Sequence, residues 1–168
     1  MTGIQKSNNS NAFFNLIRSP VSFRMFMIKK LPAAFFSGLK MEEINDDKCT
    51  VSVPYRWFTK NPFRSTYFAC LSMAAEMATG ALVLAQTYQR KPPIATLIIA
   101  VDSVYHKKAI SRTFFTCADG ALINSTVDAA VLQKEAQVIK TYSKGLNKEG
   151  ELVAEFWFTW SLKARNKT

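Results

Sequence analysis

The segment of residues 66–88 constrains the fold of this chain most, because its only charged residue is Glu76. Ser65 or Thr66 can cap the start of a long helix there, and residues 90–93, Arg-Lys-Pro-Pro, can end it. A membrane span is one interpretation, since roughly 20 apolar residues are enough to cross a bilayer. A carboxylate near the bilayer centre costs roughly 2.5–3.5 kcal/mol, however. We therefore expect a helix buried inside a protein core and no membrane span.

The segments on either side of this helix have the alternation of β-strands. In residues 48–55, Cys49, Val51 and Val53 alternate with polar residues, which is the period of a half-buried strand. With residues 39–44 this segment is predicted to form a hairpin around residues 45–47. Asn124-Ser125-Thr126 can cap a short helix to about Gln133. Further strands are predicted at residues 95–106, 110–119, 136–143 and 151–163, the last two joined around residues 145–150. In the last strand alternate residues are predicted to face one way: Leu152, Ala154, Phe156, Phe158, Trp160 and Leu162.

Two short helical pieces are predicted before the first hairpin, at residues 12–18 and 20–31. Ser19 followed by Pro20 is a suitable N-cap and first-turn pair for the second piece. Both pieces are too apolar to remain in water. We expect residues 1–168 to form one domain, with residues 1–36 as a helical segment packed on it.

The order of elements is hairpin, long helix and then several antiparallel strands. An apolar helix must be surrounded, and a curved antiparallel sheet can enclose it. The sequence therefore predicts an α+β fold in which a curved antiparallel sheet wraps around one long central helix, with extra helices at the N-terminal end.

Glu76 has two interpretations as a buried acid. In the structural one it is neutralised or paired to support packing or a dimer contact, as most buried acids are. In the catalytic one it is the reactive carboxylate. Ser72, Thr79 and Gly80 lie four residues before, three after and four after it, so they share its helix face. Small groups around one acid leave space for water or a substrate.

Residues 61–80, NPFRSTYFACLSMAAEMATG, carry a family resemblance. They resemble the helix-start motif of acyl-CoA thioesterases of the phenylacetic-acid-pathway type, which have the hot-dog fold. That motif has an Asn, a Gly three residues on, then His-Gly-Gly, and an Asp or Glu fifteen residues after the Asn; Asn61 and Glu76 keep this spacing. The resemblance extends more loosely from about residue 39 to 163, and the chain looks most similar to an uncharacterised hot-dog branch, the domain of unknown function 4442.

Three parts of the motif differ in this sequence. Arg64 stands where the motif has Gly, Tyr67 where it has His, and Phe68-Ala69 where it has Gly-Gly. The resemblance thus implies thioesterase chemistry for Asn61 and Glu76 alone. The bulky Phe68 could narrow an acyl pocket or block it.

Thioester hydrolysis needs a base or nucleophile, and donors for the developing oxyanion. Glu76 could supply the first, and the free N–H groups at the helix start, near residues 67–69, could supply the second. Asn61 or Tyr67 could position the carbonyl or the water. Tyr67 and Glu76 lie about 180° apart around the helix and about 13–14 Å apart along it. A site that uses both therefore takes one of them from a second subunit, in a homodimer or dimer of dimers.

A ligand such as acyl-CoA needs cations for its phosphates. The candidates are Lys60, Arg64, Lys107, Lys108 and Arg112. The formal net charge of +10 is spread along the chain, which argues for an anionic ligand and against a nucleic-acid-binding tail. We find no cofactor motif or metal-ligand spacing.

The remaining single residues are given structural roles. His106, the only histidine, is predicted to lie at a strand edge, and Cys70 to be buried in the helix. The three cysteines Cys49, Cys70 and Cys117 suit a reducing cytoplasm. Our first hypothesis is a cytoplasmic acyl-CoA thioesterase-like hydrolase. Its rival is a protein of the same fold that binds an acyl group or acyl-CoA without catalysis.

Overall fold

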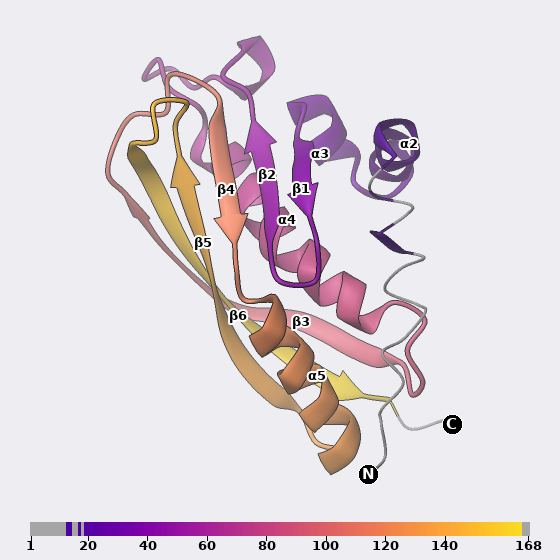
Figure 1. The fold of residues 1–168 in the computed structure, drawn as a ribbon. Coiled ribbons are helices and arrows are strands. Elements are labelled where there is room, and N and C mark those ends of the chain that lie inside the picture. The colour runs from indigo at the N-terminus through magenta and orange to yellow at the C-terminus, as the bar shows by residue number, and fades with distance from the viewer. Residues whose placement is uncertain (1–12, 15–16, 18, 166–168) are drawn as a thin grey trace.

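The structure is a computed structural model that describes residues 13–14, 17 and 19–165. Six strands form one antiparallel sheet in the order β1-β2-β4-β5-β6-β3. Figure 1 shows this sheet curving around a long helix, α4, with α2 and α3 beyond β1. The strands are β1 (Lys40–Ile44), β2 (Cys49–Val53), β3 (Ile94–Tyr105), β4 (Thr113–Cys117), β5 (Gln137–Leu146) and β6 (Leu152–Ala164).

The core helix α4 spans Phe68–Thr87 and packs against β2, β4, β5 and β6. It is long and apolar enough to cross a membrane by length and composition, but most of it is buried within the protein. Eleven of its residues are buried, including Ala74, Ala78 and Leu82, which have no exposed surface. The small alanines let the helix approach the sheet closely, so the helix is a core element as predicted.

Strand alternation correctly identified the core face. In β6, Ala154, Phe156 and Phe158 are buried while the residues between them are half-buried, and the pattern continues to Ala164. Cys49, Val51 and Val53 of β2 are fully buried as well. Both are inner strands of the sheet, and the face of each strand that contacts α4 must be apolar.

The helix boundaries differ from the sequence prediction at two places. Ser65 and Thr66 do not cap α4: the Thr66 hydroxyl and N–H both donate to the carbonyl of Ala109, at 3.0 and 2.8 Å. The N-cap is Tyr67, without a side-chain cap. Helix α5 spans Gly120–Gln133. It therefore starts four residues before Asn124, the predicted N-cap, and Asn124 lies inside the helix.

The N-terminal segment folds partly as predicted. Helix α2 (Pro20–Lys30) starts at Pro20, and Ser19 accepts a hydrogen bond from the Ser22 N–H at 3.4 Å. A further helix, α3 (Pro32–Ser37), was not predicted; it ends at Gly38, whose φ of +70° suits glycine. A 3-10 turn, η1, follows at Trp57–Thr59. The predicted helix at residues 12–18 lies largely outside the described residues.

Candidate active site

Several predicted site residues line one groove at the start of α4, which we call the helix-start groove. Its volume is about 620 Å³, and its walls come from the turn before α4 and from the end of β3. Asn61, Tyr67 and Phe68 contribute from the first, and Lys107 and Lys108 from the second. These residues are far apart in sequence, and the two hydrogen bonds from Thr66 to the Ala109 carbonyl join the two walls.

Asn61 organises the turn that leads into α4. Its Oδ1 accepts hydrogen bonds from the N–H groups of Phe63 and Ser65, at 3.0 and 3.1 Å, and from the Ser65 hydroxyl at 3.2 Å. No described residue accepts a hydrogen bond from its Nδ2. Because three donors fix the orientation of the amide, the Nδ2 group is held as a donor beside the groove.

The same turn explains why a glycine suits position 64 in the motif. Arg64 has a φ of +59°, the left-handed region that costs a residue with a Cβ roughly 1–2 kcal/mol. Its N–H donates to the Asn61 carbonyl at 3.2 Å, which closes the turn. A glycine at this position would adopt the same φ without this cost.

The first N–H groups of α4 are available at the groove. The N–H groups of Cys70 and Leu71 both donate to the carbonyl of Tyr67, at 2.9 and 3.3 Å. Those of Phe68 and Ala69 have no acceptor among the described residues, as expected for the first turn of a helix without a side-chain cap. The partial positive charge of this helix end favours an oxyanion.

Two aromatic rings stand where the motif has His and Gly. Tyr67 and Phe68 are exposed, and their rings meet edge to face at 4.9 Å. The phenol of Tyr67 is not held by another described side chain, so it is free to donate to a ligand.

Glu76 lies in a second, apolar pocket of about 260 Å³. The carboxylate lies over Gly80, one turn further along the helix. A Cβ added at Gly80 would lie 2.6 Å from Oε1 of Glu76 and 3.5 Å from the Trp160 ring. Burial raises the pKa of Glu76 above its ordinary value, and no neighbouring charge offsets this. The pocket walls come from α4, β6, β3 and the N-terminal segment, with Phe13, Ile17, Phe23, Phe26, Leu31, Met41, Met77, Thr96 and Trp160 among the lining residues.

The three small residues predicted around Glu76 do not all line its pocket. Gly80 lines the Glu76 pocket, but Ser72 and Thr79 do not. Thr79 is fully buried and its hydroxyl donates to the Glu76 carbonyl at 3.0 Å, so it belongs to the core. Residues three positions apart on a helix point in directions about 60° apart. Glu76 can therefore face the pocket while Thr79 is buried in the core.

Trp160 is a pocket residue that the sequence did not indicate. Its indole N–H is buried and has no acceptor among the described residues. Strand alternation places Trp160 on the core face of β6, but it does not reveal that α4 brings Glu76 over that position. A buried donor without a partner costs about 1–3 kcal/mol, so a ligand oxygen here would satisfy it.

The predicted cations do not form one cluster. Lys108 Nζ donates to the Phe63 carbonyl at 3.4 Å across the helix-start groove, and Lys107 pairs with Glu151 at 2.5 Å beside it. Arg64 lies in the turn and does not line the groove. Arg112 lies elsewhere, where its Nη1 donates to the Ser52 hydroxyl at 2.8 Å.

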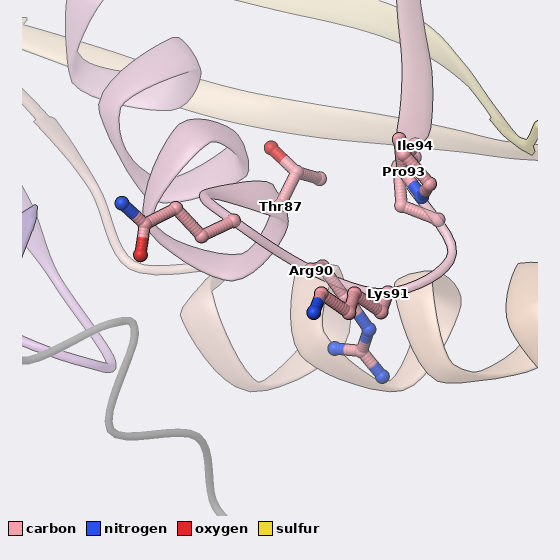
Figure 2. A pocket seen from close by; sticks show the side chains of 6 residues that line it. Thr87, Arg90, Lys91, Pro93 and Ile94 are labelled. Carbon is pink, nitrogen blue, oxygen red and sulfur yellow. The ribbon is translucent and has the colours of Figure 1, made fainter.

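A further hollow lies beyond the end of α4 and shares only Thr87 with the Glu76 pocket. Its volume is about 730 Å³, and Figure 2 shows Thr87 at the end of α4 and Arg90, Lys91 and Pro93 on the loop that leads to Ile94. Arg90 is paired with Asp128 of α5. None of the predicted site residues lines this hollow, so we do not assign the chemistry to it.

The buried thiols are poor nucleophiles. Cys49, Cys70 and Cys117 are buried and unpaired. Burial raises the pKa of the Cys70 thiol, and that of Cys117 to about 12. A thiol without a nearby cation stays protonated near neutral pH, so Cys70 is a packing residue as predicted.

Comparisons with known proteins identify the fold. The family described as "Domain of unknown function (DUF4442)" matches residues 21–162. A protein of unknown function from Pseudomonas aeruginosa, described as a probable thioesterase, has a TM-score of 0.73 at 18% identity, over 87% of this chain and 97% of that one. The PaaI protein of the Escherichia coli phenylacetic acid degradation operon has a TM-score of 0.61 at 14% identity, over 91% and 98%.

A third solved structure agrees with these two. A thioesterase from Haemophilus influenzae has a TM-score of 0.63 at 13% identity, over 87% of this chain and 91% of that one. No curated protein sequence matches the chain. At these identities the likeness establishes the hot-dog fold, and the predicted resemblance to the hot-dog branch called domain of unknown function 4442 is confirmed.

Proposed function

Because the chain belongs to the family described as Domain of unknown function (DUF4442) and has the hot-dog fold of named thioesterases, we propose that it is a thioester hydrolase acting on acyl-CoA or a related acyl thioester. The observation that carries the proposal is Glu76, the one carboxylate of α4, held half-buried over Gly80 in an apolar pocket. A fold alone does not determine chemistry, so the argument rests on this site.

The working site is composed of two chains. Within one chain the Glu76 pocket and the helix-start groove share no lining residue. The pocket includes Thr96 near the start of β3, and the groove includes Tyr105 at the end of β3. Antiparallel pairing of two β3 strands lays the start of one beside the end of the other. Glu76 of one subunit would thereby meet Asn61 and Tyr67 of its partner.

The β3 strand has the properties of a pairing edge. It is an outer strand of the sheet with 12 residues, and nearly all of them are poorly covered by the rest of the chain. Leu97, Ile99 and Val101 are about half or more exposed. A long, exposed, apolar edge is normally blocked by charge or covered by another chain. A second copy of this chain is the partner that the symmetry of the site calls for.

The reaction follows from these groups. Glu76 as general base takes a proton from water, and the hydroxide adds to the thioester carbonyl carbon. The oxyanion is stabilised by the N–H groups of Phe68 and Ala69 and by Asn61 Nδ2 of the partner subunit. The C–S bond then breaks, and the proton passes to the sulfur, which gives a carboxylic acid and a free thiol. Alternatively Glu76 adds to the carbonyl itself, the C–S bond breaks to release the thiolate, which takes up a proton from solvent, and water then hydrolyses the resulting anhydride to the carboxylic acid and free Glu76.

Lys107 and Lys108 complete the ligand site. Both line the groove where the helix-start donors lie, so phosphates of a CoA carrier would find cations on that side. Three unpaired cysteines among the described residues support a reducing compartment such as the cytoplasm.

A second candidate function is binding without catalysis. The specific observation in its favour is the Tyr67–Phe68 ring pair, which occupies the groove beside the free N–H groups. If Phe68 keeps the thioester carbonyl away from these donors, an acyl ligand would bind and remain intact.

Hydrolysis of a panel of acyl-CoAs by the native chain separates the two functions. We expect turnover that rises with pH through the raised pKa of Glu76, because only the carboxylate form can act as base or nucleophile. Thiol release is the measurement, followed from about pH 4 upward. Saturable acyl-CoA binding with no thiol release at any chain length would favour the binding protein.

A further inference from the structure

A cationic pocket lies between the N-terminal helices and the first strands. Its volume is about 310 Å³. Four cations line it, each from a different part of the chain: Arg24 on α2, Lys40 at the start of β1, Arg56 before η1, and Arg112 before β4. The four cations come from separate segments of the chain, so they become neighbours only in the folded structure.

The positive charge of this pocket is largely uncompensated. Among the described residues, the only ion pair made by the four cations joins Lys40 to Glu42 at 2.7 Å. Arg56 donates to the Phe36 carbonyl and Arg112 to the Ser52 hydroxyl, both at 2.8 Å, and the Ser52 hydroxyl donates to Glu42 at 2.6 Å. Glu42 therefore interacts with both Lys40 and Arg112, but this one carboxylate faces four cations, which leaves net positive charge for an anion.

Two features hold individual arginines in place. The Arg24 guanidinium lies over the Phe35 ring, 5.3 Å from its centre. The Arg56 guanidinium packs against Gly38, where an added Cβ would lie 2.3 Å from Nη2. Because side chains that are already ordered lose little entropy on binding, this arrangement suits a planar anion such as a carboxylate.

The cationic pocket borders the Glu76 pocket. Ile17, Phe23 and Met41 line both, so these three apolar side chains form the boundary between them. On one side the surroundings are apolar up to Glu76 and Trp160, and on the other they are cationic. The two pockets are therefore adjacent, and an apolar chain that reaches from Glu76 to the arginines must pass between these three side chains.

We propose that the acyl group of the substrate carries a carboxylate at the end remote from the thioester, and that the cationic pocket binds it. This inference rests on the proposed function and adds the substrate class, an ω-carboxyacyl thioester. The thioester carbonyl lies at Glu76, the methylene chain crosses the apolar pocket, and Arg24 and Arg112 donate to the terminal carboxylate. A plain acyl chain would bring no anion to Arg24 and Arg112, so it would bind more weakly.

Neutral and anionic ligands of equal length test the pocket without catalysis. Methyl octanoate and monomethyl suberate differ only in the terminal carboxylate, and the methyl ester stands in for the thioester. We expect calorimetry to give at least about tenfold tighter binding of monomethyl suberate, the effect of a charge-assisted hydrogen bond. The matching adipate and sebacate half-esters with their neutral partners show that chain length does not decide the result.

Two variants assign the preference to the pocket. Arg24→Met on the exposed face of α2 and Arg112→Met beside β4 should each lower the preference about tenfold. Lys29→Met, on the same helix as Arg24 but outside the pocket, is the matched control and should keep it. Equal affinity for the two esters, or a preference unchanged in both arginine variants, would overturn the inference.

The thioesters separate this inference from the proposed function. We expect suberyl-CoA to be hydrolysed with a higher kcat/KM than octanoyl-CoA, and the difference to shrink in Arg24→Met. If suberyl-CoA and octanoyl-CoA are hydrolysed with equal kcat/KM, the chain is a hydrolase and the proposed preference for an ω-carboxylate is wrong. If neither thioester is hydrolysed but monomethyl suberate still binds more tightly than methyl octanoate, the proposed hydrolase function is wrong and the proposed carboxylate site in the cationic pocket stands.

Discussion

Glu76→Gln is expected to lower the rate of thioester hydrolysis about 10²–10⁴-fold. Glutamine keeps the length and shape of the side chain above Gly80, but it can neither accept a proton from water nor form an anhydride. Initial rates on the acyl-CoA that the native chain hydrolyses fastest give the measurement. Glu149→Gln, an exposed residue of the loop between β5 and β6, is the matched control and should leave the rate unchanged.

The same substitution should preserve or increase stability near neutral pH. Burial raises the pKa of Glu76, so the native state favours the protonated carboxyl group. That contribution to stability is present at low pH and is lost as the pH rises through the raised pKa. A neutral amide removes this loss. Melting temperatures of the native and Glu76→Gln chains should therefore agree in acid and diverge, with the variant higher, as the pH rises.

If Glu76 has only a structural role, the opposite effect on stability is expected. If its carboxylate were paired across a dimer, the amide would leave a partner unsatisfied and lower the melting temperature at neutral pH. Native hydrolysis that is unchanged in Glu76→Gln would exclude Glu76 as the catalytic carboxylate, whatever its effect on stability.

Val101→Lys is expected to abolish both self-association and hydrolysis. Val101 lies near the middle of β3, so in a twofold pairing it approaches its own copy and two lysines would repel each other. Because Val101 is already 49% exposed, each separate chain should still fold. Sedimentation should give a species near the chain mass of 18.9 kDa for the variant, and we expect a dimer for the native protein.

The control for this substitution is Val138→Lys. Val138 is 61% exposed on β5, which is an inner strand of the sheet, so the same change adds charge without touching the β3 edge. It should leave both the assembly and the activity intact. A Val101→Lys chain that remains dimeric, or that hydrolyses thioesters as a monomer, would show that β3 is not the edge on which the site depends.

The local patterns of the sequence predicted the fold well. Strand alternation identified the core faces of β2 and β6, and the single charge in residues 66–88 identified α4 as a core helix. The start of α5 was wrong because Gly120 packs against the backbone of Asp46, where an added Cβ would lie 2.0 Å from the carbonyl oxygen. This close approach is a tertiary contact that no local pattern reveals.

The site was less predictable, because its walls come from distant segments. Spacing alone connected Asn61 with Glu76, and the helix period predicted that one chain cannot bring Glu76 to Tyr67. The separation of Arg112 from Lys107 and Lys108 depends on how β4 sits beside β2, where Arg112 meets Ser52. Trp160 reaches the Glu76 pocket only through the curvature of the sheet, which the sequence does not specify.

Mixing two inactive variants tests the two-chain site most directly. Glu76→Gln removes the base, and Asn61→Asp keeps the Oδ1 that holds the turn but replaces the Nδ2 donor with an oxygen. Each variant alone should be nearly inactive. In a hybrid dimer one site combines the intact Glu76 of one subunit with the intact Asn61 of the other, and the second site carries both changes.

Co-refolding equal amounts of the two chains should make about half of the dimers hybrids, each with one intact site, and so restore about a quarter of the native activity. Thiol release from the same acyl-CoA is the readout, with each variant refolded alone as the reference. Activity of the mixture equal to the mean of the two variants would contradict a site shared between subunits.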